Sequence, residues 1–241
     1  MRLLAFATRN RKEILRDPLS LLFGAGLPLA LLWLLSALQR NIPAAPYRIE
    51  NLAPGIAVFS YSFLSLFSGM LIAKDRSSSF LMRLFSSPLT PSDYILGYTL
   101  PIMPISLAQS IICFVLALSL GLGFSTYVLA TIAVLVPIGL LYVAVGLLLG
   151  ILFTDKQVGG IFAIFVNLSA WLSGTWFDLS LIGGTFEAVS YALPFAHAVA
   201  AARATLAGET AAVLPHLLWV LGYTIILFAL AVCLFRKKAK S

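Results

Sequence analysis

The chain has 241 residues, of which 61% are hydrophobic and only 10% are charged, and its mean hydropathy is +1.01. Soluble domains carry roughly a quarter charged residues, so this composition excludes an ordinary soluble protein and predicts an integral membrane protein. The net charge of +7 comes from basic residues in short flanks beside apolar runs. That placement fits lipid headgroups and membrane topology, and it argues against a nucleic-acid partner.

Residues 1–18 are predicted to form a helix that lies along the membrane surface without crossing it. Its apolar residues keep helical spacing, with the basic residues on other faces: Leu3, Leu4, Ala7, Ile14 and Leu15. Such an amphipathic helix rests with its apolar side in the interfacial layer, and Pro18 is expected to end it. The same residues also fit a simple anchor whose positive charges set the topology.

Six apolar runs are long enough to cross a bilayer, which takes about 20 residues at a rise of 1.5 Å per residue. These runs are residues 19–38, 52–73, 96–120, 127–153, 158–177 and 217–235. We therefore expect an all-α integral membrane protein with six transmembrane helices in a single transmembrane domain that covers residues 1–241.

Lysine and arginine indicate the orientation of these spans. Six spans place both ends of the chain on one side of the membrane, and thirteen basic residues fall on that side. The other side carries only Arg40, Arg48 and Arg203. Because cytoplasmic flanks hold the excess of positive charge, both termini are expected in the cytoplasm, in a multi-pass protein of the cytoplasmic (inner) membrane.

A long polar stretch, residues 74–95, separates the second and third apolar runs. Four of its residues fall at i, i+1, i+4 and i+5, which is one apolar face of a short helix: Phe80, Leu81, Leu84 and Phe85. Pro88 is expected to end that helix, because its ring nitrogen carries no N–H and cannot continue the hydrogen-bond ladder.

A second helix start is predicted directly after this short helix. Thr90 is a suitable N-cap, Pro91 occupies the first helical position, and Asp93 stands three residues after the cap. In this arrangement side chains satisfy backbone N–H groups that the first turn leaves without partners. The stretch is therefore predicted to join two membrane helices through a short amphipathic helix in the water layer.

The order of residues in this stretch resembles the cytoplasmic loop of the ABC-2 family, the membrane subunits of ATP-driven exporters. The family pattern is Asp/Glu-Arg-Glu-x-Gly-Thr-Leu-x-Arg-Leu-x-x-(Ser/Thr)-Pro, and the matching residues are Asp75, Arg76, Leu81, Arg83, Leu84, Ser87 and Pro88. Ser77 stands where an acid is usual, and Ser79-Phe80 where Gly-Thr is usual.

The resemblance implies that this segment is a coupling helix that docks on an ATPase subunit. The candidate docking residues are Asp75, Arg76, Phe80, Leu81, Arg83, Leu84 and Pro88. An arginine-rich amphipathic linker that merely lies on the membrane is the alternative interpretation of the same residues.

Residues 178–216 fit neither a simple loop nor a span. Their apolar part, residues 186–206, is broken at Pro194 and carries charged side chains, which are costly in hydrocarbon. Two short helices that dip into the outer leaflet and return fit better. Leu193-Pro194 followed by Arg203 resembles the ABC-2 pattern, which implies external re-entrant helices that close the exit or bind substrate. The alternative is a cap that only stabilises a dimer.

Sequence patterns for enzyme chemistry are missing. The chain contains no G-x-x-x-x-G-K-[ST] phosphate-binding pattern, so ATP and magnesium are expected on a partner ATPase and no cofactor on this chain. No Asp or Glu lies deep within a predicted span, which argues against paired-carboxylate catalysis and against proton-coupled carriers. The only histidines, His197 and His216, are expected outside the bilayer centre. We therefore do not expect an enzyme.

Mild polar groups inside the second and fifth spans are the candidates for lining a transport pathway: Tyr61, Ser65, Ser68, Asn167 and Ser173. The family resemblance implies that these two spans face the axis of a dimer. The alternative for the serines is close helix packing, because the pairs Ser65-x-x-x-Gly69 and Gly146-x-x-x-Gly150 allow two backbones to approach.

The resemblance and the residue patterns predict a permease subunit of an ABC-2 exporter. Two copies of the chain, or one copy and a related permease, would pair in the lipid bilayer, and two ATPase subunits would dock below them to drive a substrate outward. The neutral interior favours hydrophobic or amphipathic cargo. A non-transporting scaffold or assembly subunit is the first alternative, and a secondary carrier is the second.

Overall fold

The computed structural model describes residues 2–18, 22–39, 47–78 and 90–238, and over those residues it contains helices and no strand. The α-helices are α1 (Arg2–Leu15), α3 (Leu27–Gln39), α4 (Ile49–Ser77), α6 (Pro91–Thr99), α7 (Met103–Ser119), α8 (Thr126–Leu152), α9 (Asp155–Leu172), α10 (Gly184–Ala192), α11 (Pro194–Ala207) and α12 (Thr210–Lys238). A π-helical turn, η1 (Leu22–Gly26), precedes α3, and a 3₁₀ turn, η3 (Leu179–Leu181), precedes α10.

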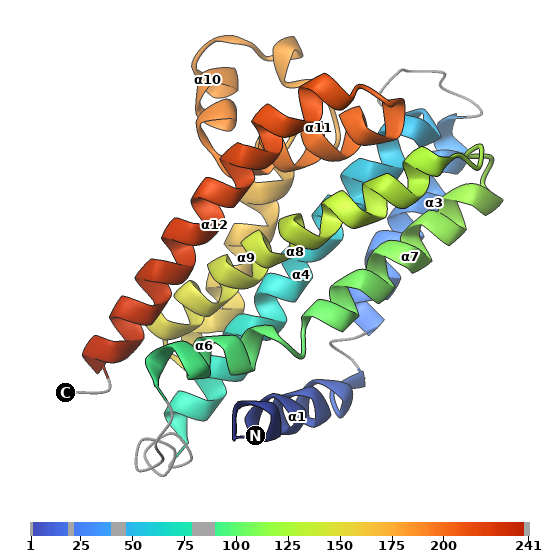
Figure 1. Ribbon diagram of the computed structural model, residues 1–241. Coiled ribbons are helices and arrows are strands. Elements are labelled where there is room, and N and C mark those ends of the chain that lie inside the picture. Colours follow the sequence, from blue (N-terminus) through green and yellow to red (C-terminus); the bar gives the residue numbers. More distant parts are fainter. Residues whose placement is uncertain (1, 19–21, 40–46, 79–89, 239–241) are drawn as a thin grey trace.

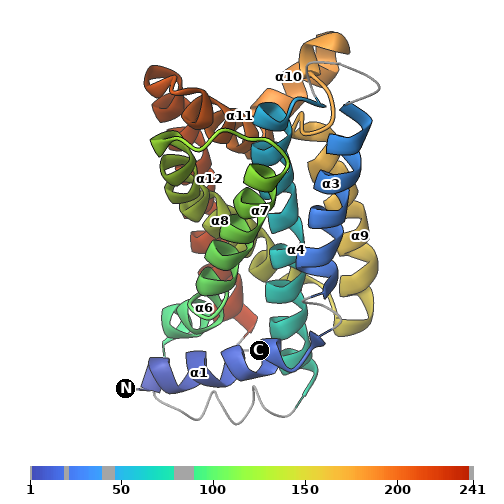
Figure 2. The ribbon, with the colours of Figure 1, turned by 90° about the vertical axis from the view of Figure 1, so that its right-hand side faces the viewer.

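The long helices form one bundle, and α1 lies across one end of it (Figures 1 and 2). The central element is α4, which packs against α3, α7, α8, α9 and α11. Nearly all of its residues between Leu52 and Ala73 are buried. Such a helix must be apolar around its whole circumference, and in α4 the main exceptions are small serines and Tyr61.

Among the described residues, four helical stretches are long and apolar enough to cross a membrane: Ile49–Ser77, Pro91–Ser119, Thr126–Leu152 and Thr210–Lys237. These stretches correspond to the second, third, fourth and sixth predicted spans. The first corresponds to a shorter apolar helix, Gly24–Gln39, and the fifth to α9, which opens with the polar residues Asp155, Lys156 and Gln157. Both α3 and α9 run alongside α4 (Figure 2). The all-helical membrane architecture is thus confirmed, whereas the count of six spans stays a prediction.

Small residues allow α4 and α8 to cross closely. A Cβ atom added to Gly69 would lie 2.9 Å from the carbonyl oxygen of Gly146, and one added to Gly150 would lie 2.8 Å from the Cα atom of Gly69. Real Cβ atoms do not approach other atoms so closely, so only glycine fits at these positions. The two small-residue pairs predicted to serve helix packing therefore meet each other, one on each helix.

The polar stretch after α4 begins later than predicted, because the helix continues through Lys74, Asp75 and Arg76 to Ser77. The hydroxyl of Ser77 donates to the Lys74 carbonyl oxygen at 2.9 Å, and that of Ser78 donates to the Asp75 carbonyl oxygen at 3.0 Å. The Lys74 carbonyl oxygen also accepts the backbone N–H of Ser78 at 3.2 Å, whereas the Asp75 carbonyl is among the last of the helix, which lack partners within it. The expectation that residues 74–77 belong to the loop was wrong.

The predicted start of the next helix is confirmed. The backbone N–H of Asp93 donates to the Thr90 hydroxyl at 3.2 Å, and the backbone N–H of Thr90 donates to the Asp93 carboxylate at 2.8 Å. Pro91 is the first residue of α6. This helix and α7 together form the third predicted span, with a break at residues 100–102, which include Pro101 and are followed by Pro104 in the first turn of α7.

The predicted apolar residues of α1 divide between the protein interior and the outer surface. Phe6, Ala7 and Ile14 are buried, whereas Leu4 is 64% exposed and Leu15 is 57% exposed. The ring of Phe6 stands edge-on to Tyr94 and Tyr98, with centroids 5.9 and 5.1 Å apart. Aromatic contacts with α6 thus decide the inward face. Leu4 and Leu15 remain on the outside.

The predicted break in the segment before the last helix is confirmed, because α10 ends at Ala192 and α11 begins at Pro194. These two short helices lie at the opposite end of the bundle from α1 (Figures 1 and 2). Gly208, with φ of 80°, caps the end of α11 in the left-handed conformation that favours glycine. Helix α12 then begins at Thr210, so residues 210–216 belong to the last helix and not to the segment before it.

Candidate functional site

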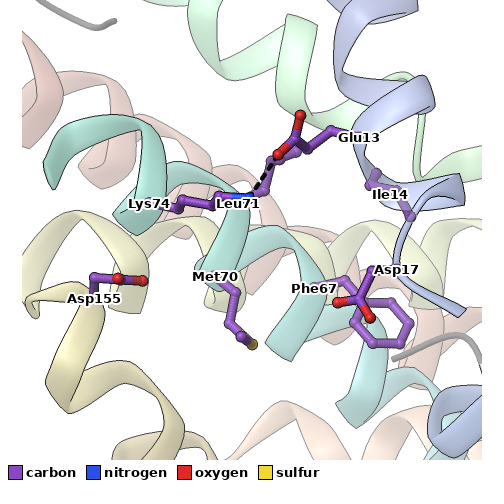
Figure 3. Close-up of a pocket in the computed structure, with 8 residues that line it drawn as sticks. All are labelled: Glu13, Ile14, Asp17, Phe67, Met70, Leu71, Lys74 and Asp155. Carbon is purple, nitrogen blue, oxygen red and sulfur yellow. Dashed lines mark hydrogen bonds and ion pairs between the residues drawn. The ribbon is translucent and has the colours of Figure 1, made fainter. Parts of the chain in front are cut away.

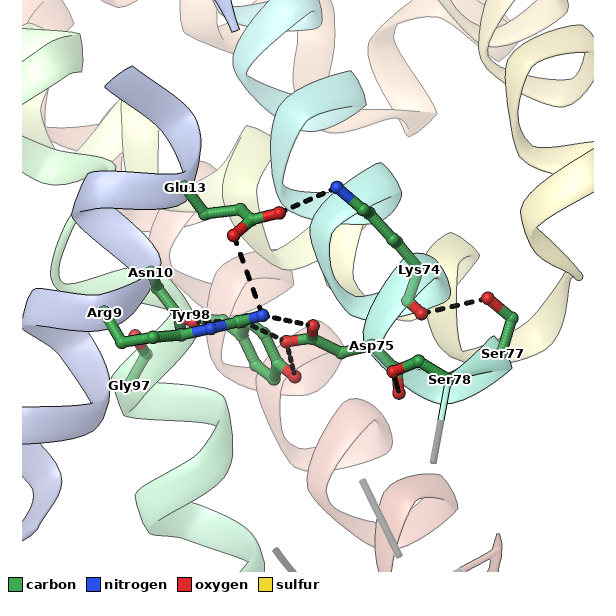
Figure 4. A network of polar contacts seen from close by, with 9 residues as sticks. All are labelled: Arg9, Asn10, Glu13, Lys74, Asp75, Ser77, Ser78, Gly97 and Tyr98. Atoms are coloured by element: carbon green, nitrogen blue, oxygen red, sulfur yellow. Dashed lines mark hydrogen bonds and ion pairs between the residues drawn. The ribbon is translucent and has the colours of Figure 1, made fainter. Parts of the chain in front are cut away.

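Three helices meet in a polar network where α1 crosses the bundle (Figure 4). Arg9 of α1 donates two hydrogen bonds to the buried carboxylate of Asp75 in α4, with N–O distances of 2.6 and 2.9 Å. The hydroxyl of Tyr98 in α6 donates to the same carboxylate at 2.9 Å. A two-point contact between a guanidinium and a carboxylate is strong and directional. It therefore sets the orientation of α1 relative to α4 and α6.

Further contacts surround this network. The side-chain amide of Asn10 is buried and donates to the Gly97 carbonyl oxygen at 3.0 Å. On the outer side, Lys74 and Glu13 form an ion pair at 2.7 Å, and Arg9 lies 3.8 Å from the same Glu13 carboxylate. The hydrogen bond from Lys74 lowers the pKa of Glu13. The exposed pair contributes little stability compared with the buried contacts.

Arg76 ties the end of α4 to the end of α8. Its guanidinium donates to the carbonyl oxygens of Gly150 at 2.8 Å, of Ile151, and of Phe153 at 3.3 Å. The last carbonyl groups of a helix have no partner within the helix and carry partial negative charge, so a cation is stabilised there. The two residues Asp75 and Arg76 therefore fasten α4 to different neighbours.

Asp75 and Arg76 were predicted to contact an ATPase, and the structure shows partners for both inside the chain. The other candidate docking residues, Phe80, Leu81, Arg83, Leu84 and Pro88, lie outside the described residues. The docking role of the segment therefore stays a prediction. What the structure adds is that α4, which leads into this segment, is fastened to α1, α6 and α8.

A cavity of about 140 Å³ lies beside the network, between α1, α4 and the start of α9 (Figure 3). It has room for a few water molecules. Its walls combine charged and apolar side chains from the three helices: Glu13, Ile14, Asp17, Phe67, Met70, Leu71, Lys74 and Asp155. Glu13 and Lys74 bind each other at its edge. This end of the bundle thus presents charges of both signs.

The pathway candidates on α4 lie inside the chain. Tyr61, Ser65 and Ser68 are all buried, and the Tyr61 hydroxyl is hydrogen-bonded to the hydroxyl of Ser110 in α7. Ser68 donates to the Ser65 carbonyl oxygen at 2.9 Å and lies 3.3 Å from the Val143 carbonyl oxygen in α8. These contacts give the three residues a role in the packing of α4 against α7 and α8. That they line a route stays a prediction.

The candidates near α9 lie apart from those on α4. The side chain of Asn167 is exposed, donates to the Ala163 carbonyl oxygen at 2.8 Å, and lines a cavity of about 230 Å³ with aromatic neighbours. Ser173 is buried and its hydroxyl is hydrogen-bonded to that of Thr175 at 2.7 Å. Asn167 is thus the candidate that faces outward, where a second copy or a substrate could reach it.

Two polar contacts escaped prediction. The buried amide of Gln109 donates to the carbonyl oxygens of Gly24 at 2.6 Å and Ser60 at 3.2 Å, so it joins η1, α4 and α7. A lone glutamine inside an apolar run was a visible signal for this role. The Nδ1 atoms of His197 and His216 lie 2.7 Å apart. Nothing in the sequence indicated that these two histidines meet.

Comparison with known proteins supports the interpretation of the fold. A family model described as "ABC-2 family transporter protein" matches residues 41–233. No curated protein matches the chain. The matched residues include α4, which binds α1 through Asp75, and all later helices up to most of α12. Because this match covers most of the chain, which also contains four helices suited to crossing a membrane, the chain belongs to the ABC-2 family of transporter proteins.

Proposed function

We propose that the chain is the permease subunit of an ATP-driven exporter in the cytoplasmic (inner) membrane. Membership of the ABC-2 family implies pairing with an ATPase subunit in general. In the proposal, two membrane subunits pair and two ATPase subunits dock below them. ATP and magnesium bind to the ATPase, and this chain performs no catalysis and binds no cofactor. Its task is to form the route and to convert ATPase movement into helix movement.

The observation that carries this proposal is the attachment of α1 to α4 by Arg9 and Asp75 and to α6 by Asn10 and the Gly97 carbonyl group. The predicted docking segment, residues 80–87, follows α4 and precedes α6 in the chain. Because both helices are tied to α1, a push on this segment cannot be absorbed by bending one helix end. It is passed to α4 as a whole.

Helix α4 is suited to carry that movement through the bundle. It packs against α1, α3, α6, α7, α8, α9 and α11, and its close glycine contacts with α8 leave no space for sliding by small side-chain adjustments. Packed cores of this kind move between discrete arrangements and do not deform continuously. A displacement at the α1 end is therefore expected to reach α10 and α11 at the far end, through the contacts that α4 and α8 make with α11.

Co-purification tests the docking. Phe80→Asp together with Leu84→Asp places two charges on the apolar face of the predicted docking helix. Burying two such side chains stabilises an interface by roughly 1.5–3 kcal/mol each. We expect tagged wild-type protein to retain the ATPase in equal amounts and the double variant to lose it. If the double variant still binds the ATPase and exports, docking through this segment is wrong.

A matched control carries the same change at the other end of the bundle. Leu181 and Ile182 are 75% and 55% exposed, so Leu181→Asp with Ile182→Asp adds two charges without disturbing the core. This control should retain the ATPase. ATP-dependent uptake of fluorescent amphipaths into inverted vesicles then separates the exporter from the scaffold alternative, because a scaffold subunit would assemble with the ATPase and give no uptake.

A further inference from the structure

A cavity of about 490 Å³ lies at the end of the bundle opposite α1. Its lining comes from the start of α4, the segment that leads from α9 to η3, η3 itself, and the helices α10 and α11. Most of its wall is apolar, with contributions from Phe177, Leu179, Tyr191 and Val199. Two side chains of opposite charge complete it, Arg203 and Asp178.

The guanidinium of Arg203 is held by backbone carbonyl groups and keeps part of its donor capacity. It donates to the carbonyl oxygens of Asn51 at 3.0 Å, Gly174 at 3.0 Å and Thr175 at 3.2 Å, one bond from each nitrogen. A guanidinium has five N–H groups, so two remain without a hydrogen-bond partner in the part of the chain that the structure describes. Burial lowers the pKa of Arg203, and the negative charge of Asp178 acts in the opposite direction.

Asp178 supplies the opposite charge nearer to solvent. Its side chain is exposed, and one carboxylate oxygen accepts the backbone N–H of Ser180 at 3.1 Å. None of the ion pairs found among the described residues joins Asp178 to Arg203. The cavity therefore holds a positive charge in its wall and a negative charge at its rim, which act on each other but form no direct ion pair.

Two separated charges in an apolar cavity favour a ligand that carries both charges. A purely anionic group would be attracted by Arg203 and repelled by Asp178. A purely cationic group would be attracted by Asp178 and repelled by Arg203. An uncharged ligand would leave both charges without new partners while displacing their water, which is costly. We propose that this cavity binds the headgroup of a zwitterionic amphipath, with its phosphate or carboxylate at Arg203, its ammonium group at Asp178 and its apolar part against the wall.

Such a ligand could come from the bilayer as a phospholipid or from solution as a smaller zwitterion, and the chemistry of recognition is the same. Binding needs only this chain, so it can be measured without an ATPase. Loss of the proposed site would leave the docking experiment unaffected, and failure of docking would leave this measurement unaffected.

The experiment is native mass spectrometry of the purified full chain in a non-ionic detergent. Three probes with the same acyl chain are titrated: lysophosphatidylethanolamine, lysophosphatidylglycerol and monoacylglycerol. We expect the zwitterionic probe to bind at least about tenfold more tightly than either of the others, as one additional charge-assisted contact allows. Equal binding of all three, or equally tight binding of the anionic probe, would overturn the proposal.

Variants locate the binding. Asp178→Asn should lower the preference for the zwitterionic over the anionic probe to about one, because an amide no longer attracts the ammonium group. Asp178 is exposed, so this variant is expected to fold normally. Glu187→Gln, on α10 and outside the cavity wall, is the matched control and should keep the preference. A preference that survives in Asp178→Asn would also overturn the proposal.

Competition identifies the source of the ligand. Soluble glycerophosphoethanolamine carries the same headgroup without an acyl chain. If it displaces the lysolipid, the site recognises soluble zwitterions by their headgroup alone. If it does not, and phosphatidylethanolamine remains on the protein after purification, the source is the bilayer. Both results support a zwitterion site, whereas displacement of the probe by monoacylglycerol alone would show a merely apolar cavity and contradict it.

Discussion

At the scale of single residues, the contacts of Asp75 differ from the contact that its motif position predicts. Its position in the chain matches a family pattern for docking, yet its carboxylate lies between Arg9 and Tyr98. Burying a charge without partners is costly, so a carboxylate at this depth requires these contacts. The motif therefore predicts which residue types stand at the end of α4. Only the folded structure shows which of their side chains face inward.

Replacing Asp75 by asparagine should destabilise the protein. The amide removes the charge that holds the Arg9 guanidinium, and hydrogen bonds to charged groups contribute about 1.5–3 kcal/mol. We expect a clear fall in unfolding temperature of the purified protein in detergent. Glu13→Gln is the control, because the Glu13–Lys74 pair is partly exposed and worth less. Equal losses in the two variants would contradict the structural role given to Asp75.

Gly146 should tolerate no larger side chain. An added Cβ would collide with the Ser68 hydroxyl and the Ser65 carbonyl group of α4. Overpacking of this kind costs about 1–3 kcal/mol, so Gly146→Leu should lower the unfolding temperature and the yield of folded protein. Gly222→Leu in α12 is the matched control, because no atom lies within 4 Å of an added Cβ there. A variant at Gly146 that unfolds like the control would show that the crossing is looser than described.

At the scale of elements, features that depend on sequence neighbours were predicted, and features that depend on distant residues were not. The Thr90 cap and the break at Pro194 are each decided within one helical turn. The end of α4 was placed at Ala73, where the apolar run stops. The helix continues because Asp75 and Arg76 find partners in α1 and α8. No periodicity within the run carries that information.

In the candidate site, too, features set by near neighbours in the sequence were predictable, and contacts between distant residues were not. Serines suited to close packing could be recognised from their spacing with glycines, and the structure places them at the crossing of α4 and α8. The meeting of Arg9 with Asp75, 66 residues away, and of Gln109 with Gly24, 85 residues away, depends on how the helices assemble. Spacing along one helix cannot indicate such contacts, because it does not define which faces of two helices meet.

The Thr90 cap gives a prediction for α6. Thr90→Ala removes the hydroxyl that accepts the N–H of Asp93, and such a change costs about 0.5–2 kcal/mol of helix stability. Amide hydrogen exchange should accelerate in the first turn of α6 and remain unchanged in α8. Ser92→Ala, one residue inside the helix, should leave exchange unchanged. Uniform acceleration throughout the protein would indicate general destabilisation and contradict a local capping role.

The contact between α11 and α12 should weaken in acid. The Nδ1 atoms of His197 in α11 and His216 in α12 lie 2.7 Å apart, so one ring must accept a hydrogen bond from the other, and burial lowers the pKa of His197 from 6.5. The folded state then binds fewer protons than the unfolded state, so the stabilisation is present above pH 6.5 and is lost as the pH falls through the folded pKa. The unfolding temperature should fall over this range, and less steeply in His197→Asn. Identical pH profiles would contradict this role of His197.

At the scale of the whole molecule, the path of the chain and the distribution of charge agree. Helix α1 and the last described turn of α12 lie at the same end of the bundle as α6, and α10 and α11 lie at the other end (Figures 1 and 2). An even number of crossings produces this arrangement. Four stretches meet the length and hydropathy of a span, and α3 and α9 alongside α4 would bring the number to six.

The orientation of the bundle can be tested by labelling single cysteines. The native Cys233 is exposed and is first replaced by serine, whereas Cys113 is buried and can remain. Ser78 and Lys156 are exposed at the α1 end, and Ala188 and Glu209 are exposed at the α10 end.

Because basic residues are concentrated at the α1 end, that end is expected in the cytoplasm. An impermeant maleimide should therefore label cysteines at positions 188 and 209 in intact cells. It should label those at 78 and 156 only after permeabilisation. The reverse pattern would place the α1 end outside, and labelling of all four positions in intact cells would show that the two ends do not lie on opposite sides of the membrane.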